Sequence, residues 1–238
     1  MSVGVFVTGT DTGVGKTCVA TALLTALSAQ GWRTAGFKPV AAGLGDGPDA
    51  VNDDVAALQS AASLPLSSHQ VGPWQLRTAC APHVAAELEA RQLPRTGWRE
   101  QAHALARQAD IVVVEGAGGF CVPLSPAHAP RWGLDDVATD IGWPVLLVVG
   151  LRLGCLNHAL LTAQAIEARG LWLAGWVGNR IDPAMAHADA NMDSLRAWLP
   201  APCWGDVPWM ATPSAHSAVA ALDLPVVARA LGLKQAPC

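Results

Sequence analysis

Short, continuously apolar segments alternate along the chain with longer segments in which apolar residues recur at helical spacing. The apolar segments predict strands at residues 3–8, 34–38, 110–115, 144–150 and 171–177. The segments of helical spacing predict helices at residues 16–29, 53–62, 83–90, 97–108, 156–169, 186–198 and 217–230. Strands that are apolar throughout and separated by helices are typical of a parallel sheet covered on both faces. We therefore predict an α/β fold.

Glycine and proline mark the ends of several of these elements. Gly31 is expected to end the first helix, and Pro39 the second strand. Residues 43–48 are rich in glycine and aspartate and predict a loop, whereas residues 63–82 have the least regular pattern and predict a lid or a peripheral loop. The sequence contains no internal repeat and no obvious linker, so we predict one domain that spans residues 1–238.

The composition excludes several classes of protein. Hydrophobic residues make up 51% of the 238 residues and charged residues 14%, which excludes a disordered chain. A net charge of −4 without runs of lysine or arginine argues against binding to nucleic acid. The longest strongly apolar run, residues 144–151, is too short to cross a bilayer, and the start of the chain lacks a signal-peptide pattern. We therefore expect a cytoplasmic protein with neither a nucleic acid nor a membrane as partner.

Cysteine and lysine are distributed in ways that bear on function. The six cysteines are widely spread and form no C-x-x-C pair, so we expect buried free thiols rather than a zinc site or a disulfide framework. The only lysines are Lys16, Lys38 and Lys234; the other twelve basic residues are arginines. A coding bias toward arginine would explain this scarcity, and so would selective retention of lysine where a compact ammonium is needed.

A glycine-rich loop lies between the first predicted strand and the first predicted helix. It reads Gly9-Thr-Asp-Thr-Gly-Val-Gly-Lys-Thr17, and this strand–loop–helix context is the one that a phosphate-binding P-loop requires. In such a loop, backbone N–H groups and the helix N-terminus bind phosphates, Lys16 neutralises the β- and γ-phosphates, and the Thr17 hydroxyl binds Mg²⁺. Five residues rather than four separate Gly9 from Gly15, and a glycine-rich turn that merely starts a helix is the alternative. The loop therefore predicts a P-loop NTPase-like three-layer α/β/α sandwich.

Candidate partners for a Mg-nucleotide lie at the ends of two other strands. Glu115 ends the clearest strand, and the carboxyl ends of parallel strands face the ligand crevice, so Glu115 is a candidate metal ligand. In the segment Asn52-Asp53-Asp54, one residue is expected to cap the following helix, and Asp53, Asp54 or neither could reach the metal. Lys38 ends the second strand, which we expect beside the strand that carries the loop. Its ammonium could meet a γ-phosphate or an anionic substrate, although an ordinary solvated lysine is equally consistent with the pattern.

Several motifs taken together resemble those of the dethiobiotin synthetase family of the biotin pathway. The motifs span residues 3 to about 210 and are Thr8-Gly-Thr-Asp-Thr-Gly-Val-Gly-Lys-Thr17, Gly36-Phe-Lys-Pro-Val40, Val114-Glu-Gly-Ala-Gly-Gly119, Leu153-Gly-Cys-Leu-Asn-His-Ala159 and Leu173-Ala-Gly-Trp-Val-Gly-Asn179. The resemblance implies an ATP- and Mg²⁺-dependent ring closure of 7,8-diaminononanoate with CO₂. One amine forms a carbamate, ATP phosphorylates the carbamate to a carbamic–phosphoric anhydride, and the second amine closes the cyclic urea.

The resemblance also assigns roles to individual residues. It implies that Lys38 and Lys16 are catalytic and that Thr17, Asp54 and Glu115 hold Mg²⁺, which selects Asp54 over Asp53. It assigns nucleotide binding to Thr12, Gly13, Val14, Gly15, Lys16, Thr17, Cys18, Asp54, Glu115, Gly116, Ala117, Gly118, Asn179, Arg180, Pro208, Trp209 and Met210. Among these nucleotide-binding residues, Asn179 would recognise the adenine edge, and residues 208–210 would line the pocket for the base. It assigns substrate binding to Thr12, Lys38, Ala42, Gly119 and Asn157.

The family is dimeric, which implies a homodimer with the substrate at the subunit boundary. The helix start near Asn157 would receive the substrate carboxylate from the partner subunit, and Asn157 could also cap that helix. Two features depart from the family. Ala42 stands where a serine often helps to bind substrate, which would cost one hydrogen bond worth about 0.5–1.5 kcal/mol. The chain has no tyrosine, whereas some members carry one near residues 186–191.

Two other functions remain as alternatives on the sequence. The amidating synthetases of cobalamin assembly share a similar loop, but they carry a glutaminase domain for which this chain has no room. A nucleotide switch of the partitioning-ATPase type usually has a second lysine within the phosphate loop, whereas here Lys16 is the only loop lysine.

Overall fold

A parallel β-sheet forms the centre of the computed structural model, which describes residues 3–45, 47 and 50–234. Within these residues the sheet has six strands, all parallel to their neighbours. In spatial order the strands are β2 (Thr34–Phe37), β5 (Ile111–Glu115), β1 (Val3–Gly9), β6 (Val145–Gly150), β7 (Leu173–Asn179) and β8 (Cys203–Val207). The predicted α/β fold with a parallel central sheet is confirmed.

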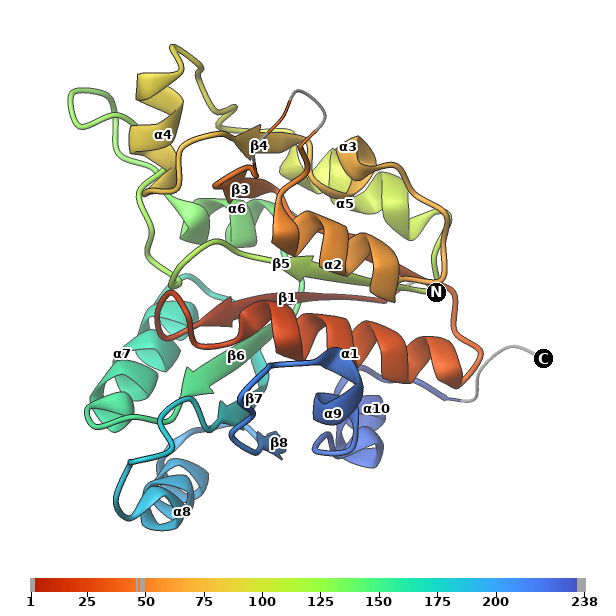
Figure 1. Ribbon diagram of the computed structural model, residues 1–238, viewed down its shortest axis with the longest axis vertical. Helices are drawn as coiled ribbons and strands as arrows, with labels where there is room; N and C mark the ends of the chain where they lie inside the picture. The colour runs from red at the N-terminus through yellow and green to blue at the C-terminus, as the bar shows by residue number, and fades with distance from the viewer. Residues whose placement is uncertain (1–2, 46, 48–49, 235–238) are drawn as a thin grey trace.

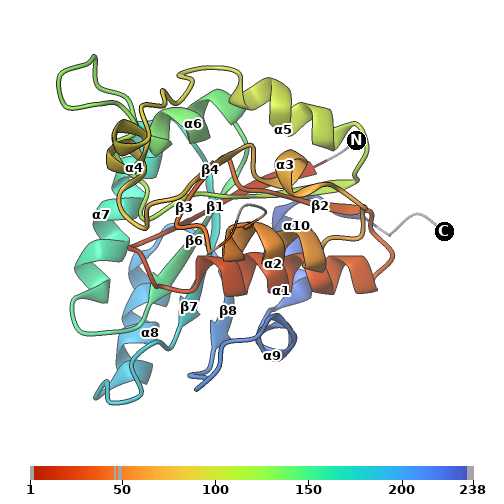
Figure 2. The same cartoon turned by 45° about the horizontal axis from the view of Figure 1, so that its top comes forward.

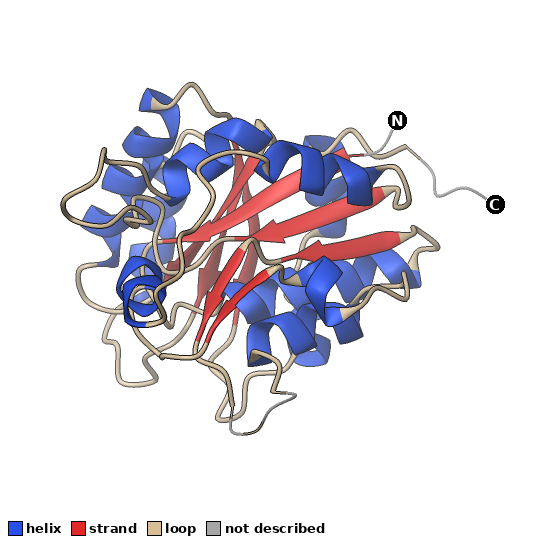
Figure 3. Cartoon of the chain, turned by 90° about the horizontal axis from the view of Figure 1, so that it is seen from above, coloured by secondary structure: helices blue, strands red, loops and turns tan. Residues whose placement is uncertain are grey.

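Helices cover both faces of the sheet and form the outer layers of a three-layer arrangement (Figures 2 and 3). The helices are α1 (Lys16–Ala29), α2 (Asp53–Ala61), α3 (Ser68–Val71), α4 (Pro82–Leu88), α5 (Trp98–Ala106), α6 (Leu134–Ile141), α7 (Cys155–Ala168), α8 (Ala188–Trp198), α9 (Ala215–Val219) and α10 (Leu224–Ala230). Helix α1 packs between α2 and α9, whereas α5 packs with α6, and α7 with α8. Both layers are needed because β2, β5, β6 and β7 are buried along their whole length.

The register of the strands aligns the residues that follow them. Val7 of β1 pairs with Glu115 of β5, and Phe37 of β2 pairs with Val114 of β5. Lys38 therefore follows β2 directly beside Glu115. Because all strands run in one direction, these residues meet at the same edge as the loop that joins β1 to α1, drawn in red in Figure 1.

One prediction about this sheet is wrong. The second strand was expected beside the strand that carries the glycine-rich loop, but β5 lies between β2 and β1. The sequence order of strands does not give their spatial order, because a crossover can place a later strand between two earlier ones. The insertion of β5 is what brings Glu115 between Lys38 and the loop.

Several elements were not predicted from the sequence. Within the region expected to be irregular, Trp74–Leu76 forms β4, which pairs in parallel with β3 (Val40–Ala42), and Ser68–Val71 forms α3. Strand β8 carries a glycine and an aspartate, which interrupt the apolar run that would have revealed it. Helix α6 buries Leu134, Val137, Ala138 and Ile141 at helical spacing, a pattern that its eight-residue length made easy to miss.

The helix predicted at residues 217–230 is instead two helices, α9 and α10. Between them, Leu222 forms a β-bridge with Gly205, and the Asp223 N–H donates to the Trp204 carbonyl at 2.7 Å. The side chain of Asp223 then caps α10. Contact with β8 thus divides a segment whose local pattern alone would continue as one helix.

The expectation of buried free thiols is only partly correct. The five cysteines among the described residues are free, and Cys155 is buried. Cys80 and Cys121 are exposed, however, because both lie in loops at the edge of the sheet where the strands end. Cys238, and residues 46 and 48 of the predicted loop at 43–48, lie outside the described residues. Among the described helices, none combines the length and the apolar character needed to cross a bilayer.

Candidate active site

The glycine-rich loop wraps around the N-terminus of α1. Gly13 and Gly15 have φ angles of 73° and 87°, in the left-handed region that glycine adopts without strain. A Cβ added to Gly15 would lie 2.1 Å from the Asn179 amide nitrogen, so any other residue here would displace the Asn179 side chain. Gly15 is the N-cap of α1, and no side chain caps that helix. The positive end of α1 is therefore directed at the cleft, as the predicted phosphate site requires.

Lys16 is the first residue of α1 and is largely buried, with 7% of its surface exposed. Its ammonium donates to the Asp11 carbonyl at 2.9 Å. Burial, and secondarily the charge of Lys38, lower the pKa of Lys16 to about 8. A lysine held in this way carries a weakly solvated charge, which strengthens its attraction for an anion.

Thr17, Asp54 and Glu115 meet at the base of the cleft. The Thr17 hydroxyl lies 2.7 Å from Asp54 Oδ1 and 2.8 Å from Glu115 Oε1. Glu115 is fully buried, and its Oε2 atom has no hydrogen-bond partner. The two carboxylates and the hydroxyl form a donor set that suits a hard divalent cation, and the free Oε2 of Glu115 adds a buried oxygen to it. The site thus has the chemistry that Mg²⁺ would need.

The choice among Asn52, Asp53 and Asp54 is decided by helix geometry. Asn52 is the N-cap of α2, and its side-chain oxygen accepts from the backbone N–H groups of Asp54 and Val55. Asp53 is exposed, whereas Asp54 lines the cleft. Asp54 is therefore the aspartate that the helix directs toward Thr17, as the family resemblance implied.

Lys38 completes this cluster, and its side chain is only 2% exposed. Its Nζ lies 2.7 Å from Asp54 Oδ2, 2.6 Å from Glu115 Oε1 and 3.3 Å from the Gly116 carbonyl. Burial disfavours its charge, but the two carboxylates outweigh that effect and raise the pKa of Lys38. Burial raises the pKa of Glu115, whereas Lys38 holds the pKa of Asp54 below its usual value despite burial. Lys38 is thus a buried ammonium within the site rather than a solvated lysine.

These groups line a cleft of about 840 Å³ at the carboxyl edge of the sheet. Its walls include many of the residues predicted to bind nucleotide or substrate: Thr12, Gly13, Gly15, Lys16, Thr17, Lys38, Ala42, Asp54, Glu115, Ala117, Gly118 and Gly119. Ala42 contributes a methyl group at the position where the family often has a serine. Ala79, Cys80 and Ala81 form a further part of the wall that was not predicted.

The residues predicted to recognise the base lie next to one another beyond the loop. Asn179 is buried, and its amide nitrogen donates to the Val14 carbonyl at 2.9 Å. Arg180 follows it, and its guanidinium pairs with Asp206 and Asp189. Its backbone N–H donates to the Val207 carbonyl, so β7 and β8 end together and Pro208 follows beside Arg180.

Three other residues assigned to nucleotide binding lie on the segment after β8 or on α1. Trp209 is 48% exposed, whereas Met210 is half-buried and packs against the core. Cys18 lies on α1 and contacts the Ser214 carbonyl at 3.7 Å, which connects α1 to the segment after β8. The guanidinium of Arg180 is paired with two aspartates and its backbone N–H with Val207, so its charge is already compensated within the protein.

Asn157 lies apart from these residues. It is exposed on the first turn of α7 and is not among the residues that line the cleft. The prediction that it could cap α7 is wrong, because Gly154 is the N-cap, with a φ of 96°, and no side chain caps the helix. Within the part of the chain that the structure describes, no side chain forms a capping hydrogen bond at the N-terminus of α7.

One pair of residues near the loop was missed. The carboxylate of Asp11 accepts from the Thr12 N–H at 2.7 Å and forms an ion pair with Arg152, which lies just before α7. These contacts hold the pKa of Asp11 below its usual value. Asp11 lies within the glycine-rich loop and Arg152 just before the motif that starts at Leu153, but only the sheet order brings the ends of β1 and β6 together.

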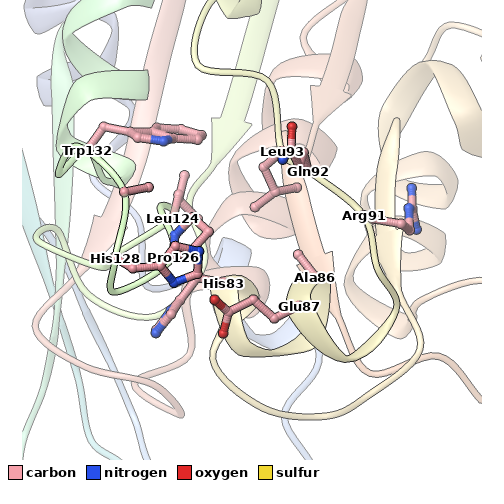
Figure 4. Close-up of a pocket in the computed structure, with 11 residues that line it drawn as sticks. His83, Ala86, Glu87, Arg91, Gln92, Leu93, Leu124, Pro126, His128 and Trp132 are labelled. Atoms are coloured by element: carbon pink, nitrogen blue, oxygen red, sulfur yellow. The ribbon is translucent and has the colours of Figure 1, made fainter.

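A second hollow, of about 390 Å³, lies beside α4 and was not predicted. Figure 4 shows Trp132 and Leu124 on one wall and Leu93, Ala86 and Glu87 on the other. None of its lining residues was assigned to nucleotide or substrate.

The fold and the site define the general class of this protein. A family model described as an AAA domain matches residues 3–217, and the chain belongs to this family. The MinD cell division protein of Aquifex aeolicus has a similar structure, with a TM-score of 0.56 and 17% identity over 99% of each chain. The chain is thus an α/β protein of the P-loop NTPase type.

More similar sequences identify the family within this class. ATP-dependent dethiobiotin synthetase BioD of Ralstonia nicotianae is 48% identical over 226 residues, which cover 94% of this chain and 97% of that protein. The protein of the same name from Aromatoleum aromaticum is 47% identical and covers 92% of this chain and 96% of its own. The chain belongs to the ATP-dependent dethiobiotin synthetase family, a family of ligase-type enzymes.

Proposed function

We propose that this protein catalyses the ATP- and Mg²⁺-dependent conversion of 7,8-diaminononanoate and CO₂ to dethiobiotin, ADP and phosphate in biotin biosynthesis. The observation that carries the proposal is the convergence of Lys38 on the carboxylates beside Thr17. Lys38 comes from outside the phosphate loop, so hydrolysis of a nucleotide alone does not account for its burial there. Relatives at 47–48% identity that carry the synthetase name support the same reaction.

The proposed phosphate site consists of Thr12, Gly13, Val14, Gly15, Lys16, Thr17 and Cys18 with the N-terminus of α1. The loop N–H groups would bind the phosphate oxygens, with Ala117 and Gly118 lining the same cleft and Gly116 next to them. Lys16 would exchange its contact with the Asp11 carbonyl for the β- and γ-phosphates. Thr17, Asp54 and Glu115 would hold Mg²⁺, which when bound neutralises charge on the same phosphates.

The chemical difficulty of the reaction is the approach of two anions. At about 4 Å and an effective dielectric near 20, a carbamate and a phosphate oxygen of unit charge repel by about 4 kcal/mol. Lys38 lies at the carboxylate end of the cleft and would contact both the carbamate and the γ-phosphate, while Lys16 holds the leaving ADP oxygens. Positive charge fixed in place before the reaction stabilises the transition state without further reorganisation.

The bond changes follow from these positions. A neutral amine of the substrate adds to CO₂ and loses a proton, which gives the carbamate. A carbamate oxygen then attacks the γ-phosphorus, and the bond from that phosphorus to the ADP oxygen breaks. The second amine attacks the carbonyl carbon of the resulting anhydride, loses a proton to solvent and expels phosphate, which closes the urea ring. Thr12, Gly119 and Ala42 would line the path of the two amines.

Adenine recognition is proposed for the end of β7. Because the Asn179 amide nitrogen donates to the Val14 carbonyl, its oxygen is left to accept from the amino group of adenine. Arg180, Pro208, Trp209 and Met210 would enclose the base, mainly through backbone and apolar contacts. Guanine has a carbonyl oxygen in place of this amino group. That oxygen and the Asn179 oxygen are both acceptors, so they could not form a hydrogen bond with each other.

We further propose a homodimer in which Asn157 serves the partner's site. Asn157 is exposed, and the N-terminus of α7 carries no capping side chain. Backbone N–H groups at such a helix end attract a carboxylate, here that of the substrate.

The test is the release of phosphate from ATP and Mg²⁺, with and without 7,8-diaminononanoate and bicarbonate. We expect release to depend on the diamine, with dethiobiotin formed in equal amount. Lys38→Met should lower turnover about 100-fold or more, because a fixed positive charge at the reacting groups is lost. Lys234→Met, at an exposed lysine, is the matched control and should leave turnover unchanged. Phosphate release that is indifferent to the diamine would refute the proposal.

A further inference from the structure

The ammonium of Lys38 occupies a position that is chemically equivalent to a cation site. Two carboxylates from different elements, Asp54 of α2 and Glu115 of β5, converge on its Nζ at 2.7 and 2.6 Å. The Thr17 hydroxyl contacts the same two carboxylates, and it shares the Glu115 Oε1 atom with Lys38. Two of the three groups assigned above to Mg²⁺, the carboxylates of Asp54 and Glu115, are therefore the groups that bind Lys38.

The charges in this cluster are unequal. Asp54 and Glu115 together carry two negative charges, and the ammonium supplies one positive charge. One oxygen of Glu115 remains buried without a partner, so the lysine does not satisfy the whole donor set. A divalent cation would balance both carboxylates and use that oxygen, but it could not share them closely with an ammonium because the two cations repel each other.

A third hydrogen-bond partner of Lys38 lies on the side of the cleft wall. Its Nζ lies 3.3 Å from the carbonyl of Gly116, which adjoins Ala117 and Gly118 on the wall of the cleft. The flexible four-carbon stem lets the ammonium leave the carboxylates while it keeps this carbonyl as a partner. That movement directs the charge into the cleft, where the proposed substrates meet.

We propose that Lys38 is an exchangeable internal counter-cation. Before a divalent cation binds, its ammonium holds Asp54 and Glu115 in place, and it gives up both carboxylates when the cation enters. This inference rests on the metal role given to these residues under the proposed function, and it deepens that function. Entry of the metal would release the lysine toward the carbamate and the γ-phosphate, so the reactive charge becomes available only when the metal is in position.

The test measures the binding of Mn²⁺ alone, by electron paramagnetic resonance of the free ion, without nucleotide or diamine. Mn²⁺ is chosen because it prefers the same oxygen ligands as Mg²⁺. The Lys38→Met protein should bind Mn²⁺ at least about tenfold more tightly than the wild type, because the charge of the donor set falls from −1 to −2. The Lys38→Met/Glu115→Gln double variant should lose this gain.

Lys16→Met is the matched control. It removes the other buried ammonium of the cleft, but Lys16 contacts the Asp11 carbonyl and neither carboxylate. Its Mn²⁺ affinity should change by less than about threefold, since only a more distant charge is lost. An equal gain in Lys16→Met and Lys38→Met would overturn the proposal, because the effect would then come from the general field of the cleft. Unchanged Mn²⁺ affinity in Lys38→Met would overturn it as well.

Removal of the ammonium could also destabilise the protein, so thermal melting with and without Mn²⁺ accompanies the binding measurement. A Lys38→Met protein that melts early but regains stability in Mn²⁺, more than the wild type gains, supports the exchange. A protein that Mn²⁺ does not stabilise overturns it, because the lysine would then be a structural ion-pair partner that no metal can replace. These measurements use neither ATP nor the diamine, so their outcome is independent of the assay for synthetase activity.

Discussion

Lys16 shows how a single residue is kept for function at a cost in stability. Its buried ammonium donates to a backbone carbonyl and is repelled by the charge of Lys38, and no carboxylate is hydrogen-bonded to it among the described residues. The pKa of about 8 means that the folded state disfavours its charge. Such destabilised charges are common where a protein must bind an anion.

This arrangement predicts that Lys16→Met stabilises the protein at neutral pH. Below pH 8 the lysine is charged in both the folded and the unfolded state, so the full cost of burying this charge near that of Lys38, about 3 kcal/mol, is present. Between the folded pKa of about 8 and the ordinary lysine pKa of 10.5, the unfolded state binds more protons, and wild-type stability rises with pH. The gain from Lys16→Met should thus be about 2–3 kcal/mol at pH 7 and should disappear toward pH 10.5.

Urea unfolding at several pH values measures this effect. Lys234→Met, at the exposed lysine, is the control and should show no change at any pH. A loss of stability in Lys16→Met at pH 7, or a gain that does not depend on pH, would contradict the explanation. The same variant should bind nucleotide poorly, because it lacks the ammonium that binds phosphate. A variant that is more stable but binds nucleotide less well would show that Lys16 lowers stability in order to bind the nucleotide.

At the scale of elements, the start of α2 sets the position of Asp54. Asn52 is buried and makes contacts in three directions. Its oxygen caps α2, its amide nitrogen donates to the Gly43 carbonyl at 2.7 Å, and its backbone N–H donates to Gln75 Oε1 at 2.8 Å. The cap therefore ties the helix that carries Asp54 to the chain segments after β3 and around β4.

We predict that Asn52→Ala weakens both the fold and the metal site. Loss of the cap should cost about 1–2 kcal/mol of stability. Because α2 would then fray at its first turn, where Asp54 lies, the Mg²⁺ concentration needed for half-maximal turnover should rise several-fold. Ser67→Ala is the matched control, since Ser67 caps α3 through a similar contact away from the cleft. If both variants lose similar stability and show the same Mg²⁺ dependence, Asn52 does not position Asp54.

At the scale of the whole molecule, the strand order collects the site at one edge of the sheet. The loop after β1, Lys38 after β2 and Glu115 at the end of β5 meet there. The end of β7 brings Asn179 against the phosphate loop. Asn157 is the exception, because α7 carries it on the surface. The proposed dimer gives Asn157 its role in binding the substrate of the partner subunit.

The proposed dimer predicts complementation between two inactive variants. Lys38→Met and Asn157→Asp should each have low activity, the latter because its new charge repels the substrate carboxylate. In a mixed dimer, one site would combine the intact Lys38 of one subunit with the intact Asn157 of the other. Random reassociation of equal amounts should therefore restore about a quarter of wild-type turnover.

A pair of variants from the same half of the site provides the control. Lys38→Met and Lys16→Met both remove residues from one subunit's own cleft, but an intact site needs both lysines in the same chain. In their mixed dimer each subunit lacks one of them, so no activity should return. Absence of recovery in the first mixture, with mixed dimers shown by mass spectrometry, would contradict a shared site.

Local sequence determined much of this protein by itself. Continuous apolar runs specified buried strands because a strand covered on both faces has no polar side. The loop from Gly9 to Thr17 specified its own turn and helix start because its glycines adopt the required dihedral angles. Lys38 and Glu115 could be singled out as strand-end residues from the chain alone. Strand β8 and the break between α9 and α10 could not be predicted from the chain alone, because they depend on contacts between separate segments.

Only the tertiary structure decided how these residues combine. The sequence does not reveal that β5 lies between β1 and β2, because strand order depends on the packing of whole helices and strands. That order places Glu115 between Lys38 and Thr17, and the cap at Asn52 adds Asp54 to the same point. The scarcity of lysine suggested that Lys16 and Lys38 were special. Their different surroundings, a carbonyl for one and two carboxylates for the other, arise from contacts across the fold and distinguish the roles proposed for them.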